Sequence, residues 1–328
     1  LVGSEMCIRD RRVDLTLFSE KIQELKDRIA SVIVGQEQTV DLVLTAILAN
    51  GHVLIEGVPG VAKTLLARLT ARLIDADFSR VQFTPDLMPS DVLGTTVFNM
   101  KTNGFDFHQG PIFADIVLVD EINRAPAKTQ AALFEVMEER QISIDGTTHR
   151  MGDLYTILAT QNPVEQEGTY KLPEAQLDRF LMKITMDYPS LEEEVNILER
   201  HHTNAALVKL DDITPAITKE ELLSLRAFMN QVFVDRTLLQ YIALIVQQTR
   251  TSKAVYLGAS PRASVAMLQS SKAYALLQGR DFVTPEDIKF VAPYVLQHRL
   301  ILTAEAEMEG YSPVKVTQRL IDKVEVPK

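Results

Sequence analysis

The stretch GVPGVAKT, residues 57–64, follows the apolar run HVLIE, residues 52–56, and decides how the rest of the chain is interpreted. It nearly matches the pattern G-x-x-x-x-G-K-[ST], with Ala62 in place of the second glycine. In loops of this pattern, successive backbone N–H groups and the next helix N-terminus surround phosphate groups. Gly57 and Gly60 supply the small side chains that a close backbone approach needs. We expect Ala62 to have a negative φ at the helix start, where alanine is sterically allowed.

The residues that follow this loop, and two strand ends downstream, carry the chemistry. Lys63 is expected to contact the β- and γ-phosphates and Thr64 to give its hydroxyl to Mg²⁺. The apolar run IVLVDE ends in Asp120 and Glu121, which would hold the magnesium shell and polarise a water. Asn162, in LATQNP, is suited to orient the attacking water. The stretch 57–64 alone also fits a glycine-rich turn before a core helix, but the combination predicts a nucleoside triphosphatase.

Two arginines complete the candidate site. Arg179, in LPEAQLDRF, is expected at the far end of a helix, from where it would reach the γ-phosphate of a neighbouring subunit. The alternative is a surface ion pair with Asp178 or Glu174. In GASPRA, the N-cap and first-turn signals put Arg262 at the positive end of a helix dipole, where a cation needs an anion such as a bound phosphate.

The order of apolar runs along the chain predicts the fold class. Short strand-like runs alternate with helical patterns, which is typical of a parallel sheet covered by helices on both faces. In such sheets, ligands bind at the carboxyl ends of the strands. The five predicted strands are residues 53–57, 80–84, 116–121, 155–163 and 181–186.

Two segments interrupt this alternation. Residues 95–110 contain Asn103-Gly104 and residues 141–151 contain Asp145-Gly146, each flanked by strand-like runs, which predicts two β-hairpins. The hairpins are either surface decoration or inserts that line a pore or meet a partner.

The chain divides near Pro189. We expect a core domain over residues 13–189 and a smaller all-α domain over 190–328, with helix starts signalled at 218–221 and 284–287. Residues 1–12, LVGSEMCIRDRR, lack the apolar region of a signal peptide and are expected to be a non-native or disordered leader.

Composition limits the classes of function. The chain has 328 residues, 46% of them hydrophobic, and a formal net charge of -10, which disfavours a surface that coats nucleic acid. Its only cysteine, Cys7, excludes an intrachain disulfide and a cysteine-rich metal site, and fits the reducing cytoplasm. No apolar stretch is long enough to span a membrane.

These motifs resemble the AAA+ ATPases and, within them, the MoxR family, from about Leu17 to the carboxyl end. MoxR proteins share the alanine found here at position 62. The resemblance is carried by IVGQEQ (33–38), HVLIEGVPGVAKT (52–64), FTPDLMPSDVLG (83–94), GPIFADIVLVDEINRAPAKTQAALFEVMEE (110–139), LATQNPVEQEGTYKLPEAQLDRF (158–180) and GASPRA (258–263).

The resemblance implies an α/β fold: an AAA+ P-loop αβα core with a parallel five-stranded sheet and inserted β-hairpins, followed by a smaller all-α lid domain. ATP and Mg²⁺ are the implied cofactors, and Arg124 is a further interface candidate. The implied roles are Walker A for Lys63 and Thr64, Walker B for Asp120 and Glu121, sensor 1 for Asn162, arginine finger for Arg179, sensor 2 for Arg262, metal binding for Thr64 and Asp120, and nucleotide contacts for Val34, Gly35, Gln36, Gly57, Val58, Pro59, Gly60, Val61, Ala62, Lys63, Thr64 and Leu65.

The same resemblance implies a homo-oligomeric ring, typically a hexamer, whose hairpins are the helix-2 and pre-sensor inserts and whose Arg262 acts in its own or a neighbour's site. It implies a chaperone-like role in assembling, activating or remodelling a protein complex, with a partner that bears a von Willebrand factor A-type domain. The alternatives are a metal-chelatase motor subunit, a nucleic-acid motor and an ATP-gated scaffold with little turnover. The inserts contain Lys101, His108, His149 and Arg150 but no run of Lys or Arg, which weakens the nucleic-acid alternative.

Overall fold

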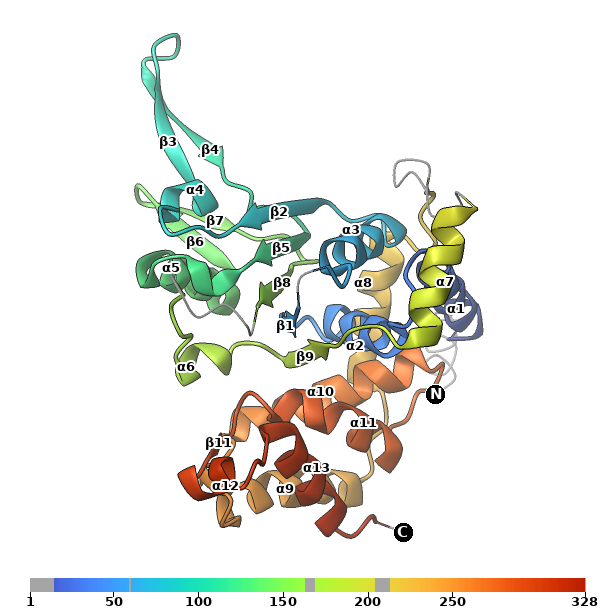
Figure 1. Ribbon diagram of the computed structural model, residues 1–328. Helices are drawn as coiled ribbons and strands as arrows, with labels where there is room; N and C mark the ends of the chain where they lie inside the picture. The colour runs from blue at the N-terminus through green and yellow to red at the C-terminus, as the bar shows by residue number, and fades with distance from the viewer. Residues whose placement is uncertain (1–14, 59, 163–168, 204–212, 328) are drawn as a thin grey trace, which may run out of the picture.

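The computed structural model describes residues 15–58, 60–162, 169–203 and 213–327. A parallel sheet with helices on both faces forms one part of the molecule, and a group of helices from the second half of the chain packs beneath it (Figure 1). Within the described ranges, no helix has the length and apolar character needed to cross a membrane. The predicted α/β class with a helical lid is confirmed.

The central sheet has five parallel strands in the order β2-β5-β8-β1-β9. Each corresponds to a predicted apolar run, although β2 begins two residues before the predicted start because Phe78 pairs with Ile116 at the beginning of β5. Their bounds are β1 Val53–Gly57, β2 Phe78–Gln82, β5 Ile116–Asp120, β8 Thr156–Gln161 and β9 Met182–Met186.

Alternation along the strands divides the core between the two faces of the sheet. In β1, Val53 and Ile55 join a cluster with the first three helices, whereas Leu54 joins a second cluster on the opposite face. The helices of the first face are α1 (Leu15–Val32), α2 (Glu37–Leu48) and α3 (Lys63–Leu73), and those of the second are α4 (Pro89–Leu93) and α5 (Ala127–Glu139).

Both predicted hairpins are present. The first pairs β3 (Gly94–Asn99) with β4 (Gly104–Gln109) and projects away from the sheet (Figure 1). The second pairs β6 (Gln141–Ile144) with β7 (Thr147–Arg150). Asp145 and Gly146 make a two-residue turn with φ of +50° and +81°, the left-handed pair that this turn requires. Gly104 instead opens β4, so the first turn spans residues 100–103.

The carboxyl half is mostly helical, as predicted, with helices starting at both signalled positions. Thr218 and Thr284 form capping boxes with Glu221 and Asp287. The prediction missed a small antiparallel pair, β10 (Val255–Leu257) with β11 (Ile301–Leu302). The helices are α6 Glu174–Leu177, α7 Leu191–His202, α8 Lys219–Phe228, α9 Arg236–Thr251, α10 Pro261–Leu277, α11 Pro285–Leu296, α12 Ala304–Met308 and α13 Pro313–Lys323, with 3-10 helices η2 Ile122–Arg124 and η4 Met229–Gln231.

The first helices after Pro189 lie beside the core (Figure 1). In α7, Arg200 donates to the carbonyls of Ala30 and Ser31, and in α8, Arg226 donates to the carbonyl of Ile47. One hydrophobic cluster also runs from α1 and α2 into α9, α10 and α11. The domain boundary at Pro189 therefore stays a prediction, and the predicted leader 1–12 lies outside the described residues.

A buried histidine anchors the start of the central strand β1. His52 accepts a hydrogen bond at Nδ1 from the backbone N–H of Ile157, 3.0 Å away, so its Nε2 carries the hydrogen and donates to the carbonyl of Met137 at 3.1 Å. Burial, with a smaller contribution from the charge of Arg140, lowers the pKa of His52 to about 3. The neutral ring therefore satisfies both backbone groups, and a proton on Nδ1 would break one of these bonds.

We expect His52 to make the fold acid-sensitive. Because its pKa is about 3 in the fold and near 6.5 when unfolded, its contribution is complete above about pH 6.5 and is lost as pH falls towards 3. Between pH 7.5 and 5.5 this loss should be about 1 kcal/mol of unfolding free energy. Urea unfolding of His52→Gln should lack this part of the pH dependence, whereas exposed His201→Gln should keep it. Equal pH dependence in both variants would contradict this assignment.

Candidate active site

The parallel register brings several predicted site residues to one edge of the sheet. Glu56 in β1 is aligned with Gln161 in β8, and Val119 in β5 is aligned with Ala159 in β8. The loop that follows β1, the acidic residues that end β5 and Asn162 after β8 therefore share the carboxyl edge. This is the edge at which an open α/β sheet binds its ligands.

The loop 57–64 joins β1 to α3. A side chain at Gly57 would lie 2.8 Å from the carbonyl oxygen of Met186, so close packing favours glycine there. Gly60 has φ of +89°, so the backbone conformation favours glycine at that position. Lys63 begins α3, and its Nζ donates to the Gly57 carbonyl at 2.5 Å, which lays the ammonium across the loop. Val58 and Val61 pack on the core, Thr64 and Leu65 follow in the first turn of α3, and Pro59 lies outside the described residues.

The expected negative φ at Ala62 is wrong. Ala62 is the N-cap of α3 with φ of +59° and ψ of +23°, in the left-handed region. The loop turns through this residue while the Ala62 carbonyl already accepts the N–H of Leu66 at 2.9 Å as the first helical bond. Such a conformation costs an L-residue about 1–2 kcal/mol. The general pattern therefore has glycine at this position because glycine adopts the left-handed conformation without strain. Ala62 adopts the same left-handed conformation at an energetic cost.

Asp120 is buried at the end of β5, with two partners for its carboxylate. Its Oδ1 accepts the hydroxyl of Thr160 at 3.0 Å, and its Oδ2 accepts Nε of Arg80 at 2.6 Å. Arg80 reaches it from β2, the neighbouring strand. Sequence analysis did not identify Arg80 or Thr160 as site residues. Only their positions on β2 and β8, the strands on either side of β5, could have indicated that they contact Asp120.

Glu121 adopts a strained backbone at the same edge. It has φ of +56°, its N–H donates to Thr160 Oγ1 at 3.0 Å, and it is the residue before η2. Its Oε2 accepts Nε2 of Gln82 at 2.8 Å and lies 3.0 Å from Nε of Arg124. Left-handed non-glycine residues concentrate at functional sites, where the surrounding structure compensates their strain. Gln82 is a further candidate that sequence analysis missed.

Asn162 lies just past β8 with 7% of its surface exposed. Since β8 lies between β5 and β1, this side chain sits between the acidic residues and the loop 57–64. A nearly buried amide at the centre of the edge can both donate to and accept from a ligand.

The donor set at this edge suits magnesium bound mainly through phosphate. Thr64 and Asp120 offer a hydroxyl and a carboxylate, the hard oxygen donors that Mg²⁺ takes together with substrate phosphates and water. Within the described ranges, no group of three or more His, Cys, Asp or Glu side chains could hold a metal by itself. The two residues therefore fit a metal that arrives with a nucleotide.

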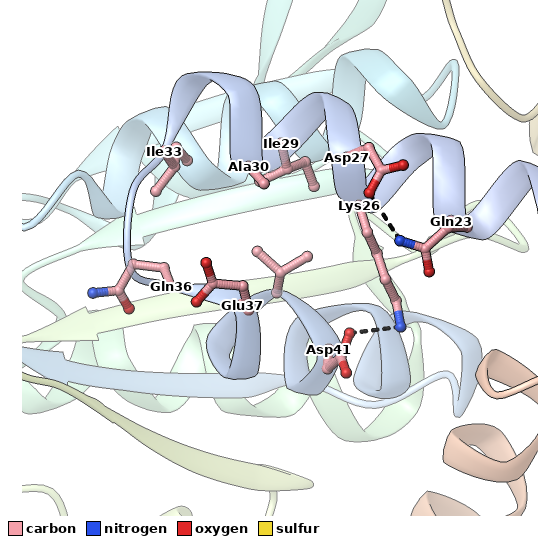
Figure 2. A pocket seen from close by; sticks show the side chains of 10 residues that line it. Gln23, Lys26, Asp27, Ile29, Ala30, Ile33, Gln36, Glu37 and Asp41 are labelled. Carbon is pink, nitrogen blue, oxygen red and sulfur yellow. Dashed lines mark hydrogen bonds and ion pairs between the residues drawn. The ribbon is translucent and has the colours of Figure 1, made fainter. Parts of the chain in front are cut away.

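The turn between α1 and α2 contains the other predicted nucleotide contacts, Val34, Gly35 and Gln36. Gly35 has φ of +73°, and a side chain there would collide with the Glu193 carboxylate of α7. Gln36 also lines a pocket of about 200 Å³ between α1 and α2 (Figure 2). An ion pair of 2.8 Å between Lys26 and Asp41 crosses that pocket, and its lining comes from residues 23–41, so it is separate from the loop 57–64.

Arg179 and Arg262 do not join the carboxyl edge. Both meet Glu138 in the last turn of α5: Arg179 Nε lies 2.7 Å from its Oε2, and Arg262 Nη2 lies 3.0 Å from its Oε1. Arg179 thus makes a surface ion pair, as the alternative expected, but with Glu138 instead of Asp178 or Glu174. The Asp178 carboxylate binds the buried Arg299 instead. Arg179 follows the short helix α6 and precedes β9.

Comparison with known proteins agrees with this architecture. Residues 52–182 match the ATPase family associated with various cellular activities (AAA), and residues 247–322 match the AAA lid domain. The protein YeaC of Bacillus subtilis is 47% identical over 92% of this chain and 93% of its own length. Chaperone MoxR1 of Mycobacterium tuberculosis is 44% identical over 92% of this chain and 81% of its own. A crystal structure of a Cytophaga hutchinsonii protein assigned as an ATPase is 40% identical, with a TM-score of 0.89, and covers 99% of this chain and 100% of its own.

The sheet order, the loop 57–64 and the acidic end of β5 define a P-loop ATPase of the AAA+ class with a helical lid. Within that class, the chain belongs to the MoxR family.

The strained Ala62 yields a stability prediction. Ala62→Gly should raise the unfolding free energy by about 0.5–1 kcal/mol, because relief of the left-handed conformation outweighs the entropy that glycine adds to the unfolded chain. Ala67→Gly, in the regular part of α3, is the matched control and should lower it by about 1 kcal/mol or more. Urea unfolding of both variants measures the difference, and equal destabilisation would contradict the strain at Ala62.

Proposed function

We propose that this chain hydrolyses Mg-ATP at the interfaces of a homo-oligomeric ring, a hexamer, and uses the cycle to remodel a protein complex in the cytoplasm as a chaperone. Lys63 and Thr64 hold the phosphates, Asp120 and Thr64 hold the magnesium shell, and Glu121 activates the water that Asn162 orients. The supporting observation is that these groups lie at one edge of the sheet while Arg179 and Arg262 lie elsewhere.

The separation of the two groups supports catalysis across an interface. Arg179 precedes β9, which starts level with the start of β1 because Met182 pairs with Val53. The loop 57–64 instead follows the end of β1, five residues later. At about 3.3 Å per residue, the strand alone separates the two edges by roughly 16 Å, and the Arg179 side chain is turned to Glu138. Arg179 would therefore meet the phosphates of a neighbouring copy, and Arg262 with it.

The inserted hairpins support a protein client. The β3–β4 hairpin exposes several apolar side chains far from the core. The packing of a single subunit does not explain this exposed apolar surface, which is typical of an interaction site. Phe98 and Phe105 contact each other edge to face across this hairpin, with ring centroids 5.2 Å apart. The exposed members are Val97 (46%), Phe98 (47%), Met100 (88%) and Phe105 (72%).

The name of the relative Chaperone MoxR1 supports the same role. The proposal extends to a partner with a von Willebrand factor A-type domain, which rests on the family resemblance of the motifs. A nucleic-acid motor would instead need cationic side chains on the inserts. His149 is packed against Phe107, with ring centroids 4.3 Å apart, so it contributes to the internal contacts of the two hairpins.

Replacement of Glu121 tests the catalytic edge. Glu121→Gln should bind ATP and Mg²⁺ as the wild type does but turn over about 10²–10⁴-fold more slowly, because the carboxylate that accepts the proton from water is lost. Glu135→Gln, on the exposed face of α5, removes the same charge and should leave the rate unchanged. Steady-state phosphate release and equilibrium nucleotide binding separate the two effects. Wild-type turnover in Glu121→Gln would assign the base elsewhere.

A mixing experiment tests whether Arg179 acts across an interface. Lys63→Ala chains should be inactive alone because they lose the cation that holds the phosphates. Arg179→Ala chains should be inactive alone because an arginine finger contributes about 10³–10⁵ in rate. In mixed rings, some interfaces pair an intact loop with an intact arginine, so partial activity should return. Wild-type activity per chain should also rise with protein concentration as rings assemble.

Arg236→Ala, an exposed arginine at the start of α9, is the control and should remain active alone. If mixed rings form but stay inactive, graded mixtures of wild type with each variant decide the cause. A steep loss at low variant fractions means that every site must be intact, whereas a proportional loss would contradict the assignment of Arg179.

A further inference from the structure

Glu138 connects three separate parts of the chain. It lies in the last turn of α5, Arg179 lies between α6 and β9, and Arg262 lies in the first turn of α10 in the helical lid. Each carboxylate oxygen of Glu138 receives one arginine, Oε2 from Arg179 and Oε1 from Arg262. One side chain of the core therefore fixes how far apart the two guanidinium groups lie.

Glu138 and Arg262 each lie at the end of a helix where the helix dipole disfavours their charge. A carboxylate is unfavourable near a helix C-terminus, yet the last turn of α5 has Glu138 and no basic residue. A cation is unfavourable near a helix N-terminus, yet the first turn of α10 has Arg262 and no acidic residue. The two misplaced charges compensate each other, and the hydrogen bond from Arg179 holds the pKa of Glu138 below its ordinary value.

Stability alone is a weak reason for this cluster. The side chains of Glu138, Arg179 and Arg262 are 36%, 29% and 63% exposed, and ion pairs this accessible to water contribute little to folding. Arg179 also lies over the ring of Phe134, with its guanidinium carbon 5.9 Å from the ring centroid, which restricts its orientation further. The cluster therefore restricts long side chains at a position where this restriction adds little to the stability of the fold.

The geometry leaves both arginines able to bind an anion. Arg179 uses only Nε, and Arg262 only Nη2, in their hydrogen bonds to the part of the chain that the structure describes. Both side chains line an open surface hollow of about 480 Å³. The guanidinium fork fits carboxylate and phosphate oxygens alike, so two arginines that share one carboxylate are spaced to share one phosphate.

We propose that Glu138 is the positioning residue for Arg179 and Arg262, and that it holds the two guanidinium groups together so that they bind one phosphate of a neighbouring copy's nucleotide. This inference rests on the proposed catalysis across an interface. Because Glu138 lies in the core and Arg262 in the lid, the contact also fixes the lid at the angle that presents both arginines.

Replacement of the carboxylate tests the proposal. Glu138→Gln should lower kcat for ATP hydrolysis about ten- to a hundredfold, the range known for outer partners that orient metal ligands, with ATP binding and ring assembly unchanged. Glu139→Gln, the adjacent exposed residue of α5, removes the same charge and should have no effect. Thermal unfolding of both variants checks the fold, and Glu138→Asp, which keeps the charge on a shorter stem, should give an intermediate kcat. Equal kcat in Glu138→Gln and Glu139→Gln would overturn the proposal.

Double replacement shows whether Glu138 acts through the arginines. In a chain with Arg179→Ala and Arg262→Ala, adding Glu138→Gln should cause no further loss, because residues that act as a unit are not additive. An undiminished further loss would overturn the proposal. Glu138→Gln chains mixed with Lys63→Ala chains should regain activity, since the second chain supplies intact Glu138 and arginines to the first chain's intact loop.

The same measurements distinguish this inference from the function on which it rests. If Arg179→Ala hydrolyses ATP as fast as the wild type, catalysis across the interface fails, and the positioning role fails with it. If Arg179→Ala is slow but Glu138→Gln is as fast as Glu139→Gln, only the role of Glu138 is overturned.

Discussion

Parallel pairing of β1 with β8 and β9 is the constraint on which the rest of this structure depends. Together with the parallel pairs of β5 with β8 and β2 with β5, it places every strand's carboxyl end at one edge and every amino end at the other. Residues that follow strands, such as Lys63 and Glu121, therefore gather at the first edge, whereas Arg179, which precedes β9, lies at the second. In the ring proposed above, a single subunit would thus carry two half-sites that face apart, and the sheet itself would give the physical reason for assembly.

Backbone strain and unfavourable charge placement both occur at these two edges of the sheet. Ala62 and Glu121 adopt left-handed conformations at the carboxyl edge. Ala62 accepts the first helical hydrogen bond of α3, and Glu121 donates to Thr160 in β8. Glu138 and Arg262 occupy the unfavourable ends of their helices at the other edge. Neither arrangement follows from local preference, which favours glycine in the first case and the opposite charges in the second. Each edge therefore has residues that local structural preference alone would not favour.

Partners from neighbouring strands shape the acidic edge. Arg80 and Gln82 extend from β2 to Asp120 and Glu121, and Thr160 extends from β8 to both. These contacts exist because β5 lies between β2 and β8 in the sheet. The carboxylates are consequently oriented by side chains that are distant in sequence, which is the usual way that a rigid sheet prepares a site for a ligand.

The sequence by itself determined what is local. Apolar runs located all five strands of the sheet, Asp145-Gly146 located a hairpin turn, and Thr218 and Thr284 located helix starts, because periodicity, turn chemistry and capping act between near neighbours. The motif 57–64 and the strand ends at Asp120, Glu121 and Asn162 pointed to a nucleotide site, because each is recognised within its own short contiguous pattern. Only the tertiary structure decided the pairing of Arg80 with Asp120 and the meeting of Arg179 and Arg262 at Glu138. Those features depend on which strands and helices become neighbours, and long-range packing fixes that order where no local pattern records it.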